Sequence, residues 1–441
     1  MSWKPSSFNR FVRVGGETVV YNTLSGVTWP LDGGEVEEAL REGVGELTSG
    51  SAHLPSLGLL VREGKDQLEL AREVYKRYIR PEDELELTLM PTEECNFRCS
   101  YCYESFQRGK MDEGVVEGVR SLVEERVPEE GRLKISWFGG EPLLALDVVE
   151  SLSRFFVGMA EERSLLYGAG MTTNGYLLDG ETASRLIGWG VDQFQVTLDG
   201  PPREHDSRRK LAGGGGSFGK IFSNLLSLRE SDLQFQVLIR VNFDRDNLGR
   251  VGELLEVLEP LRDPRFSLGF RPVGKWGGPN DGELAVCPLG EGERNIVELA
   301  SRAASRGFRA QDLEDLGPGS SLCYAGKPSS FVVGSDGRLY KCTVDFDSEL
   351  NQVGRLTREG VRLNEEKLAR WSLEWEEIDE ECKRCKFFPL CGGNSCPVTR
   401  LRGEMVCPFP RREIDRIVAA REEMKRVEGK KKGIMSNFPG R

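Results

Sequence analysis

From about residue 84, short apolar segments alternate with longer amphipathic segments along the chain. Six of the short segments are rich in branched and aromatic residues and are bounded by turn-forming residues, as β-strands are. They cover residues 84–91, 133–139, 169–175, 192–200, 234–242 and 265–273. The stretches between them, such as DEGVVEGVRSLVEERV, repeat apolar residues at helical spacing. This alternation predicts parallel β-α units, and therefore an α/β fold for residues 84–310.

The segments on either side of this region follow other patterns. Residues 8–31 are typical of short strands separated by Gly15-Gly16 and Ser25-Gly26 turns, and helical patterns follow at 35–43 and 66–79. We expect a small separate domain at residues 1–80. After residue 310, cysteine, glycine and proline dominate until a final helix in RREIDRIVAAREEMKRV. We therefore expect a cysteine-rich, metal-dependent domain at 315–412, and a C-terminal helix with a basic tail at 413–441.

Composition narrows the function classes. The 441 residues carry a formal net charge of −11, which argues against a nucleic-acid partner because phosphate binding needs a basic surface. No run of about 18 apolar residues exists, and the N-terminus lacks the apolar segment of a secretory signal. We therefore expect a cytoplasmic protein with no membrane partner. The chain has only two histidines, so a catalytic mechanism that depends on histidine is not expected. Eleven cysteines in a reducing compartment indicate metal binding or sulfur chemistry instead.

Three cysteines, Cys95, Cys99 and Cys102, follow the first predicted strand in the segment CNFRCSYC. Three thiolates on one loop can bind three irons of a 4Fe-4S cluster and leave the fourth iron open for a ligand. The alternative is zinc, which usually takes four protein ligands in paired short spacings. The C-x-x-x-C-x-x-C spacing, with Tyr101 before the last cysteine, resembles the signature of the radical SAM superfamily.

This resemblance implies a partial (β/α)6, TIM-like barrel and a 4Fe-4S cluster that binds S-adenosylmethionine (SAM). It also implies a reaction in which a one-electron reductant, such as flavodoxin or ferredoxin, drives cleavage of SAM to a 5′-deoxyadenosyl radical. That radical removes a hydrogen atom from the substrate, so catalytic histidines are not needed.

Polar residues at the ends of the later strands resemble SAM contacts of the same family. The FGGEP segment resembles the part of the family that meets the SAM amino group, and Arg209 in HDSRR matches an arginine near the SAM carboxylate. Each such residue could instead be a helix cap or a surface charge. Parallel barrels, however, assemble active sites at the C-terminal ends of successive strands. The predicted SAM site consists of Tyr101, Gly139, Gly140, Glu141, Thr173, Asn174, Thr197 and Arg209.

The C-terminal cysteines are consistent with either zinc or iron-sulfur on spacing alone, although seven exceed the needs of one zinc. Their order resembles the SPASM domain, which carries two auxiliary clusters. We expect these to be of the 4Fe-4S type, giving three iron-sulfur clusters in all. The resemblance implies one cluster on Cys382, Cys385, Cys391 and Cys407, and another on Cys323, Cys342 and Cys396.

This chain departs from the SPASM pattern in two places. Four residues rather than three separate Cys391 from Cys396, and one upstream cysteine of the family is absent. The cluster of Cys323, Cys342 and Cys396 therefore has an open iron or takes Cys287 as a ligand. Cys287 in LAVCPLG is otherwise typical of a small buried hydrophobic residue.

Three functions remain open. SPASM enzymes mostly modify peptides, and residues 1–80 resemble a winged-helix element that binds leader peptides by strand addition, although they could simply cap the barrel. We therefore favour maturation of a ribosomally made precursor peptide, through a thioether or carbon-carbon crosslink. The second function is anaerobic sulfatase maturation, in which relatives carry Asp where this chain has Thr343; Asp345 is the nearest candidate base. The third is a non-catalytic metal-binding module.

Overall fold

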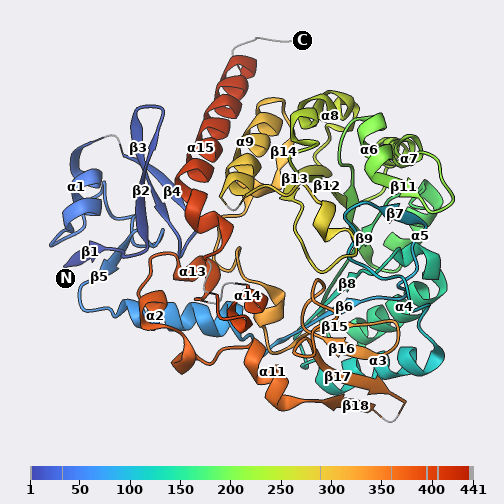
Figure 1. Ribbon diagram of the computed structural model, residues 1–441. Helices are drawn as coiled ribbons and strands as arrows, with labels where there is room; N and C mark the ends of the chain where they lie inside the picture. The colour runs from blue at the N-terminus through green and yellow to red at the C-terminus, as the bar shows by residue number, and fades with distance from the viewer. Residues whose placement is uncertain are drawn as a thin grey trace. The chain divides into compact units, whose positions relative to one another are not determined.

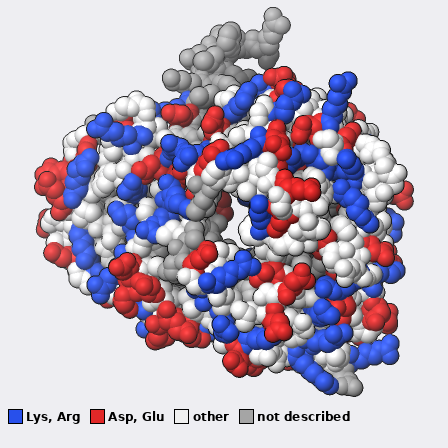
Figure 2. Space-filling view, viewed as in Figure 1, with Lys and Arg blue, Asp and Glu red and all other residues white. Residues whose placement is uncertain are grey.

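The computed structural model describes residues 2–436 except 32, 289, 359, 394–395 and 405–406. The chain forms two compact units. The barrel unit comprises Glu82–Gln311 and Lys327–Ser372, and the terminal unit comprises Met1–Pro81, Asp312–Gly326 and Leu373–Arg441. Every helix among the described residues is too short or too polar to cross a membrane. On the face drawn in Figure 2, Lys and Arg side chains are interspersed with Asp and Glu.

The six predicted strands are all present in the barrel unit, and each is parallel to its neighbour, which confirms the predicted α/β class (Figure 1). In spatial order the strands are β6 (Glu84–Leu89), β8 (Arg132–Trp137), β9 (Leu166–Thr173), β10 (Val191–Thr197), β12 (Gln236–Phe243) and β13 (Phe266–Pro272). In β8 and β12, buried side chains alternate with less buried ones, as expected of strands whose two faces differ in cover.

Helices connect these parallel strands and lie along the outer side of the curved sheet (Figure 1). Asp112 and Asp179 cap two of them by accepting hydrogen bonds from Val115 N and Thr182 N, each at 2.9 Å. The helices are α3 (Glu113–Arg126), α4 (Leu146–Glu162), α5 (Gly180–Gly188), α6 (Pro202–Arg208), α7 (Phe218–Glu230), α8 (Val251–Val257) and α9 (Glu291–Ser305).

The sheet extends beyond the six predicted strands to eleven within the described residues. β14 (Arg309–Ala310) adds to β13, and β15 (Ser330–Val333) lies parallel to β6. Antiparallel strands then follow: β16 (Arg338–Tyr340), β17 (Gln352–Thr357) and β18 (Gly360–Leu363). The Lys327 ammonium bridges Glu84 and Glu86 at 2.7 and 2.9 Å. Residues 327–372, which the sequence placed with the C-terminal cysteines, therefore share a compact unit with the six strands.

The terminal unit combines both ends of the chain. The predicted strands at 8–31 are present as an antiparallel sheet of β2 (Asn9–Val14), β3 (Glu17–Asn22) and β4 (Thr28–Leu31). Helices α1 (Gly34–Glu42), α2 (Gln67–Val74) and α15 (Phe409–Ser436) match the predicted helices, and β1 (Trp3–Pro5) pairs with β5 (Leu60–Arg62). Phe8 and Leu70 share one apolar core with Ile378 and Phe388, so residues from both ends complete the same core.

The turn before the first cysteine is fixed by the two glycines that follow β8. Gly140 N donates to Thr92 O at 3.2 Å, and Glu141 N donates to Glu94 O at 2.8 Å. Gly139 has a φ of 116°, and a side chain at Gly140 would overlap the carbonyl oxygens of Glu93 and Glu94. These glycines therefore allow one backbone to approach another, here the cysteine loop itself.

We expect Gly140→Ala to lower the melting temperature by about 5–10 °C, because the added Cβ must displace the backbone of the cysteine loop. The matched control is Gly158→Ala on α4, where no atom lies within 4 Å of the added Cβ. That variant should keep or raise the melting temperature by about 1–3 °C, since alanine favours helix. Calorimetry of both variants checks this, and equal melting temperatures would contradict it.

Candidate active site

The thiols of Cys95, Cys99 and Cys102 line one cavity of about 990 Å³ within the barrel unit. Its walls come from the C-terminal ends of β8, β9, β10 and β12 and from the segment after β13. The cysteine loop contains the short strand β7 (Phe97–Cys99), which pairs antiparallel with β11 (Arg209–Leu211) and places Arg209 opposite Cys99. A hollow lined by aromatic side chains together with a few polar and charged groups is typical of a site for a small-molecule cofactor or substrate.

Burial raises the pKa of Cys95 and of Cys102 to about 12, and it also raises the pKa of Cys99. The neighbouring thiols raise these values further for Cys95 and Cys102. Metal binding at this site must therefore displace protons. No three His, Cys, Asp or Glu side chains within the described ranges converge closely enough for a single metal ion. A 4Fe-4S cluster uses one thiolate per iron, so three separate thiols along one cavity fit it.

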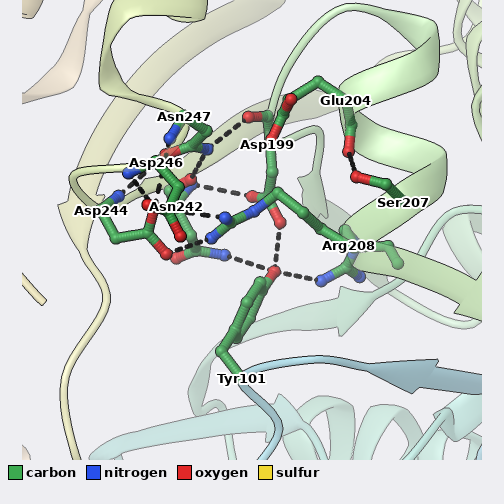
Figure 3. A network of polar contacts seen from close by, with 10 residues as sticks. Tyr101, Asp199, Glu204, Ser207, Arg208, Asn242, Asp244, Asp246 and Asn247 are labelled. Carbon is green, nitrogen blue, oxygen red and sulfur yellow. Dashed lines mark hydrogen bonds and ion pairs between the residues drawn. The ribbon is translucent and has the colours of Figure 1, made fainter. Parts of the chain in front are cut away.

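Tyr101 anchors the cysteine loop to the ends of two strands (Figure 3). Its hydroxyl donates to Asp199 Oδ2 and accepts from Asn242 Nδ2 at 3.1 Å and from Arg209 at 2.7 Å. Asp199 also accepts from Asn242 N at 2.9 Å. Burial raises the pKa of Tyr101 well above its usual value, so the hydroxyl stays protonated and keeps its donor. The loop is therefore tied to residues after β10 and on β12.

A buried ion pair lies beside these contacts (Figure 3). Arg208 and Asp244 form two hydrogen bonds, at 2.7 and 3.2 Å, and both side chains are buried. In addition, the backbone N–H of Ser100, in the cysteine loop, donates a hydrogen bond to the backbone oxygen of Arg208 at 2.9 Å. Removing one partner would leave an uncompensated buried charge, so the pair holds Arg208 firmly in place. It thereby also positions the next residue, Arg209.

The sequence places Glu141 among the SAM contacts, but in the structure its side chain lies outside the cavity wall. The side chain is fully buried. One carboxylate oxygen accepts from Thr173 Oγ1 at 2.8 Å and from Leu143 N at 3.1 Å, and the other accepts from Asn174 N at 2.7 Å. Glu141 therefore acts on the cavity through the residues it positions, Thr173 and Asn174, instead of contacting the cavity itself.

Two guanidinium groups give one side of the cavity a positive charge. Arg209 is buried, and although burial opposes its charge, Cys99, Tyr101 and Asp199 raise its pKa. Its Nε has no hydrogen-bond partner among the described residues. Arg240 on β12 also lines the cavity and donates from Nε to Asn242 at 2.8 Å; burial and Arg271 lower its pKa. A carboxylate in the cavity would find two cationic partners.

The structure brings most of the predicted SAM-site residues to this cavity. Those that line it are Tyr101, Gly139, Gly140, Thr173, Asn174, Thr197 and Arg209. Sequence reasoning missed Arg240, Asn242 and Glu104, which line it as well. A signal existed for two of them: Arg240 interrupts an apolar strand, and Glu104 comes two residues after Cys102.

A second hollow of about 480 Å³ adjoins the cavity, and we call it the side hollow. The two share Tyr103, Glu104 and Trp276 in their walls. Asp345, the candidate base, lines the side hollow and not the cavity. Burial, followed by the neighbouring Glu93, raises the pKa of Glu104 to about 8.

The structure brings together four of the C-terminal cysteines within the terminal unit. Burial raises the pKa of Cys391 to about 12, and the neighbouring Cys385, Cys382 and Cys407 raise it as well. These are the four residues predicted to hold one auxiliary cluster. Cys323 and Cys396 also belong to the terminal unit, whereas Cys342 and Cys287 belong to the barrel unit. The assignment of Cys323, Cys342 and Cys396 to a common cluster stays a prediction.

Comparison with known proteins identifies the family of the cavity. Residues 89–258 match the model of the radical SAM superfamily. The chain is 26% identical over 334 residues to a cysteine-type anaerobic sulfatase-maturating enzyme of Clostridium perfringens, covering 70% of this chain and 88% of that enzyme. It is 28% identical over 203 residues to an AdoMet-dependent heme synthase of Nitratidesulfovibrio vulgaris, covering 45% and 52% of the two chains.

A solved structure has the same fold. Native anSMEcpe with bound AdoMet and Kp18Cys peptide superposes with a TM-score of 0.56 at 19% identity, covering 79% of this chain and 99% of that chain. The matched segment 89–258 contains the cysteine loop and β8, β9, β10 and β12, which carry most of the cavity wall. The barrel unit therefore contains a radical SAM domain at residues 89–258.

Proposed function

We propose that this enzyme cleaves SAM in the cavity of the barrel unit and uses the resulting radical to modify a peptide. The observation that carries the proposal is the convergence of three cysteine thiols and two arginines on one cavity at the C-terminal ends of parallel strands. Within the family, a 4Fe-4S cluster and SAM supply the electron and the 5′-deoxyadenosyl radical that removes a hydrogen atom.

The residues of the chain have separate roles in this proposal. Cys95, Cys99 and Cys102 hold the cluster, and Arg209 and Arg240 bind the SAM carboxylate as ion-pair partners. Gly139 and Gly140 present backbone groups, while Thr173, Asn174 and Thr197 offer hydrogen bonds. The aromatic side chains that line the cavity exclude water, which protects a reactive radical from competing reactions. They are Phe97, Phe106, Phe138 and Trp276.

A precursor peptide is the substrate class that we favour. The similarity to sulfatase-maturating enzymes supports action on a polypeptide, and Thr343 stands where we expect those enzymes to carry an acidic base. The three-stranded sheet of residues 9–31 supports leader binding, because β2 and β4 are its edge strands among the described residues and an edge strand can pair with an added strand. We expect a thioether or carbon-carbon crosslink as the product.

Formylglycine formation is the second candidate. It is favoured by the match to 88% of the length of the Clostridium perfringens enzyme. In this case Asp345 would act as the base from the side hollow, which adjoins the cavity through Glu104.

The same proposal includes three iron-sulfur clusters and an electron donor. Cys382, Cys385, Cys391 and Cys407 would hold one auxiliary cluster, and Cys323, Cys342 and Cys396 the other. Flavodoxin or ferredoxin would supply single electrons in the cytoplasm. Cys287 is only half-buried, and its pKa is raised by burial and by Glu291 and Asp244.

Cys99→Ala should abolish 5′-deoxyadenosine formation from SAM under dithionite, because one cluster ligand is lost. Cys287→Ala, a cysteine outside the cavity wall, is the matched control and should retain it. Chromatography of the nucleoside products and an iron count on each variant provide the measurement. Deoxyadenosine production by the Cys99 variant would refute the assigned ligand set.

Arg209→Gln should weaken SAM binding about 10- to 100-fold, since a charge-assisted hydrogen bond contributes about 1.5–3 kcal/mol. Arg203→Gln on the exposed side of α6 removes an equal charge and should bind SAM as the unmodified enzyme does. Equilibrium dialysis with labelled SAM on cluster-loaded protein measures both affinities. Identical affinity in the Arg209 variant would exclude this residue from the SAM site.

The product distinguishes the two substrate classes. Incubation of the reduced enzyme and SAM with a cysteine-containing sulfatase peptide should leave that peptide unchanged, while a precursor peptide encoded beside the gene should acquire a crosslink. Tandem mass spectrometry reads both outcomes. An aldehyde in place of the sulfatase cysteine thiol would establish formylglycine formation instead.

A further inference from the structure

The side hollow has a chemistry of its own. Four carboxylate residues and one guanidinium line it among the described residues: Glu93, Glu104, Asp345, Asp347 and Arg108. Arg108 is already engaged, because it contacts Glu93 at 3.1 Å and Asp336 at 3.6 Å. With Arg108 engaged, Asp345 and Asp347 leave the hollow with a net negative charge.

Glu104 is a buried residue of the side hollow with one carboxylate oxygen that lacks a hydrogen-bond partner among the described residues. Its side chain is 8% exposed, and the oxygen that lacks a partner among these residues is Oε1. Buried polar atoms are nearly always paired in folded proteins. Because Glu104 lines both the side hollow and the cavity of the three thiols, its missing partner can be a group of a bound molecule.

Trp276 forms another part of the shared wall. Its side chain is 48% exposed, although large apolar side chains are usually buried, and it stands in the glycine-rich segment 274–278. An indole face beside carboxylates is a favourable environment for a cation, since the ring attracts positive charge electrostatically. The carboxylates and the indole thus point to the same ligand class independently.

We propose that the side hollow binds a basic side chain, lysine or arginine, of the peptide substrate, with Glu104 as its buried carboxylate partner and Trp276 as its aromatic wall. The inference rests on the proposed function and adds a sequence requirement to it. The reacting residue must lie in the cavity of the thiols, so the basic residue lies close to it in the peptide. Glu104 therefore determines specificity and positions the substrate.

Two small probes test this inference on the full-length, cluster-loaded enzyme with SAM bound. Nα-acetyl-arginine methylamide carries the cation, and Nα-acetyl-citrulline methylamide has nearly the same shape without charge. Isothermal titration should show that the arginine probe binds at least about tenfold more tightly, as expected for a charge-assisted hydrogen bond. Glu104→Gln should reduce this preference to near one. Glu230→Gln at the exposed end of α7 should keep it.

Equal affinities for the two probes in the unmodified enzyme overturn the inference, and so does a preference that survives Glu104→Gln. If Glu104→Gln fails to retain iron, Trp276→Leu takes its place, because this residue lies in an exposed segment. That variant should bind the arginine probe several-fold more weakly, and unchanged affinity overturns the proposal. Deoxyadenosine formation is measured on the same preparations. Its absence from the unmodified enzyme refutes the proposed function, whereas its presence without cation preference refutes only the side hollow's role.

Discussion

The cysteine loop must hold three thiols in place with almost no regular secondary structure of its own. Backbone and side-chain hydrogen bonds from strand ends supply what a helix or sheet would otherwise supply. Glu141 N and Asn174 Nδ2 bind the loop from β8 and β9, at Glu94 O and Asn96 Oδ1, and the Tyr101 hydroxyl binds Asp199. Because Glu141, Asn174 and Asp199 are buried, breaking one of these bonds leaves an unpaired polar group, and this cost keeps the loop in one conformation.

The same arrangement places positively and negatively charged side chains in different parts of the cavity wall. Arg209 and Arg240 approach from β11 and β12, while Glu104 follows directly from the cysteine loop. A ligand with separated charges therefore has a preferred orientation before any close contact forms. SAM carries both a carboxylate and cationic groups, so under the proposed function the positive side of the cavity would select its carboxylate end. The acidic side hollow leaves a complementary position for a second molecule.

Local patterns were sufficient to predict the six strands and their parallel order, because branched residues and helical crossovers encode that arrangement locally. They were not sufficient for β15, since four residues carry no periodicity and their partner β6 lies more than 200 residues earlier. Glu141 shows a similar limit at the site. A carboxylate after two glycines is equally typical of a ligand and of a structural acceptor, and only the proximity of Thr173 and Asn174 decides between them.

The shared core of the terminal unit also sets an order of events during synthesis. Phe8, Leu70 and Ile79 leave the ribosome early, but Ile378 and Phe388, which complete their core, are among the last quarter of the chain to emerge. Residues 1–81 therefore keep apolar surface exposed until the barrel unit has been synthesised. A premature stop between residues 372 and 378 would spare every residue of the thiol cavity and still remove the partners of this core. An intact cavity is therefore not sufficient for a folded chain.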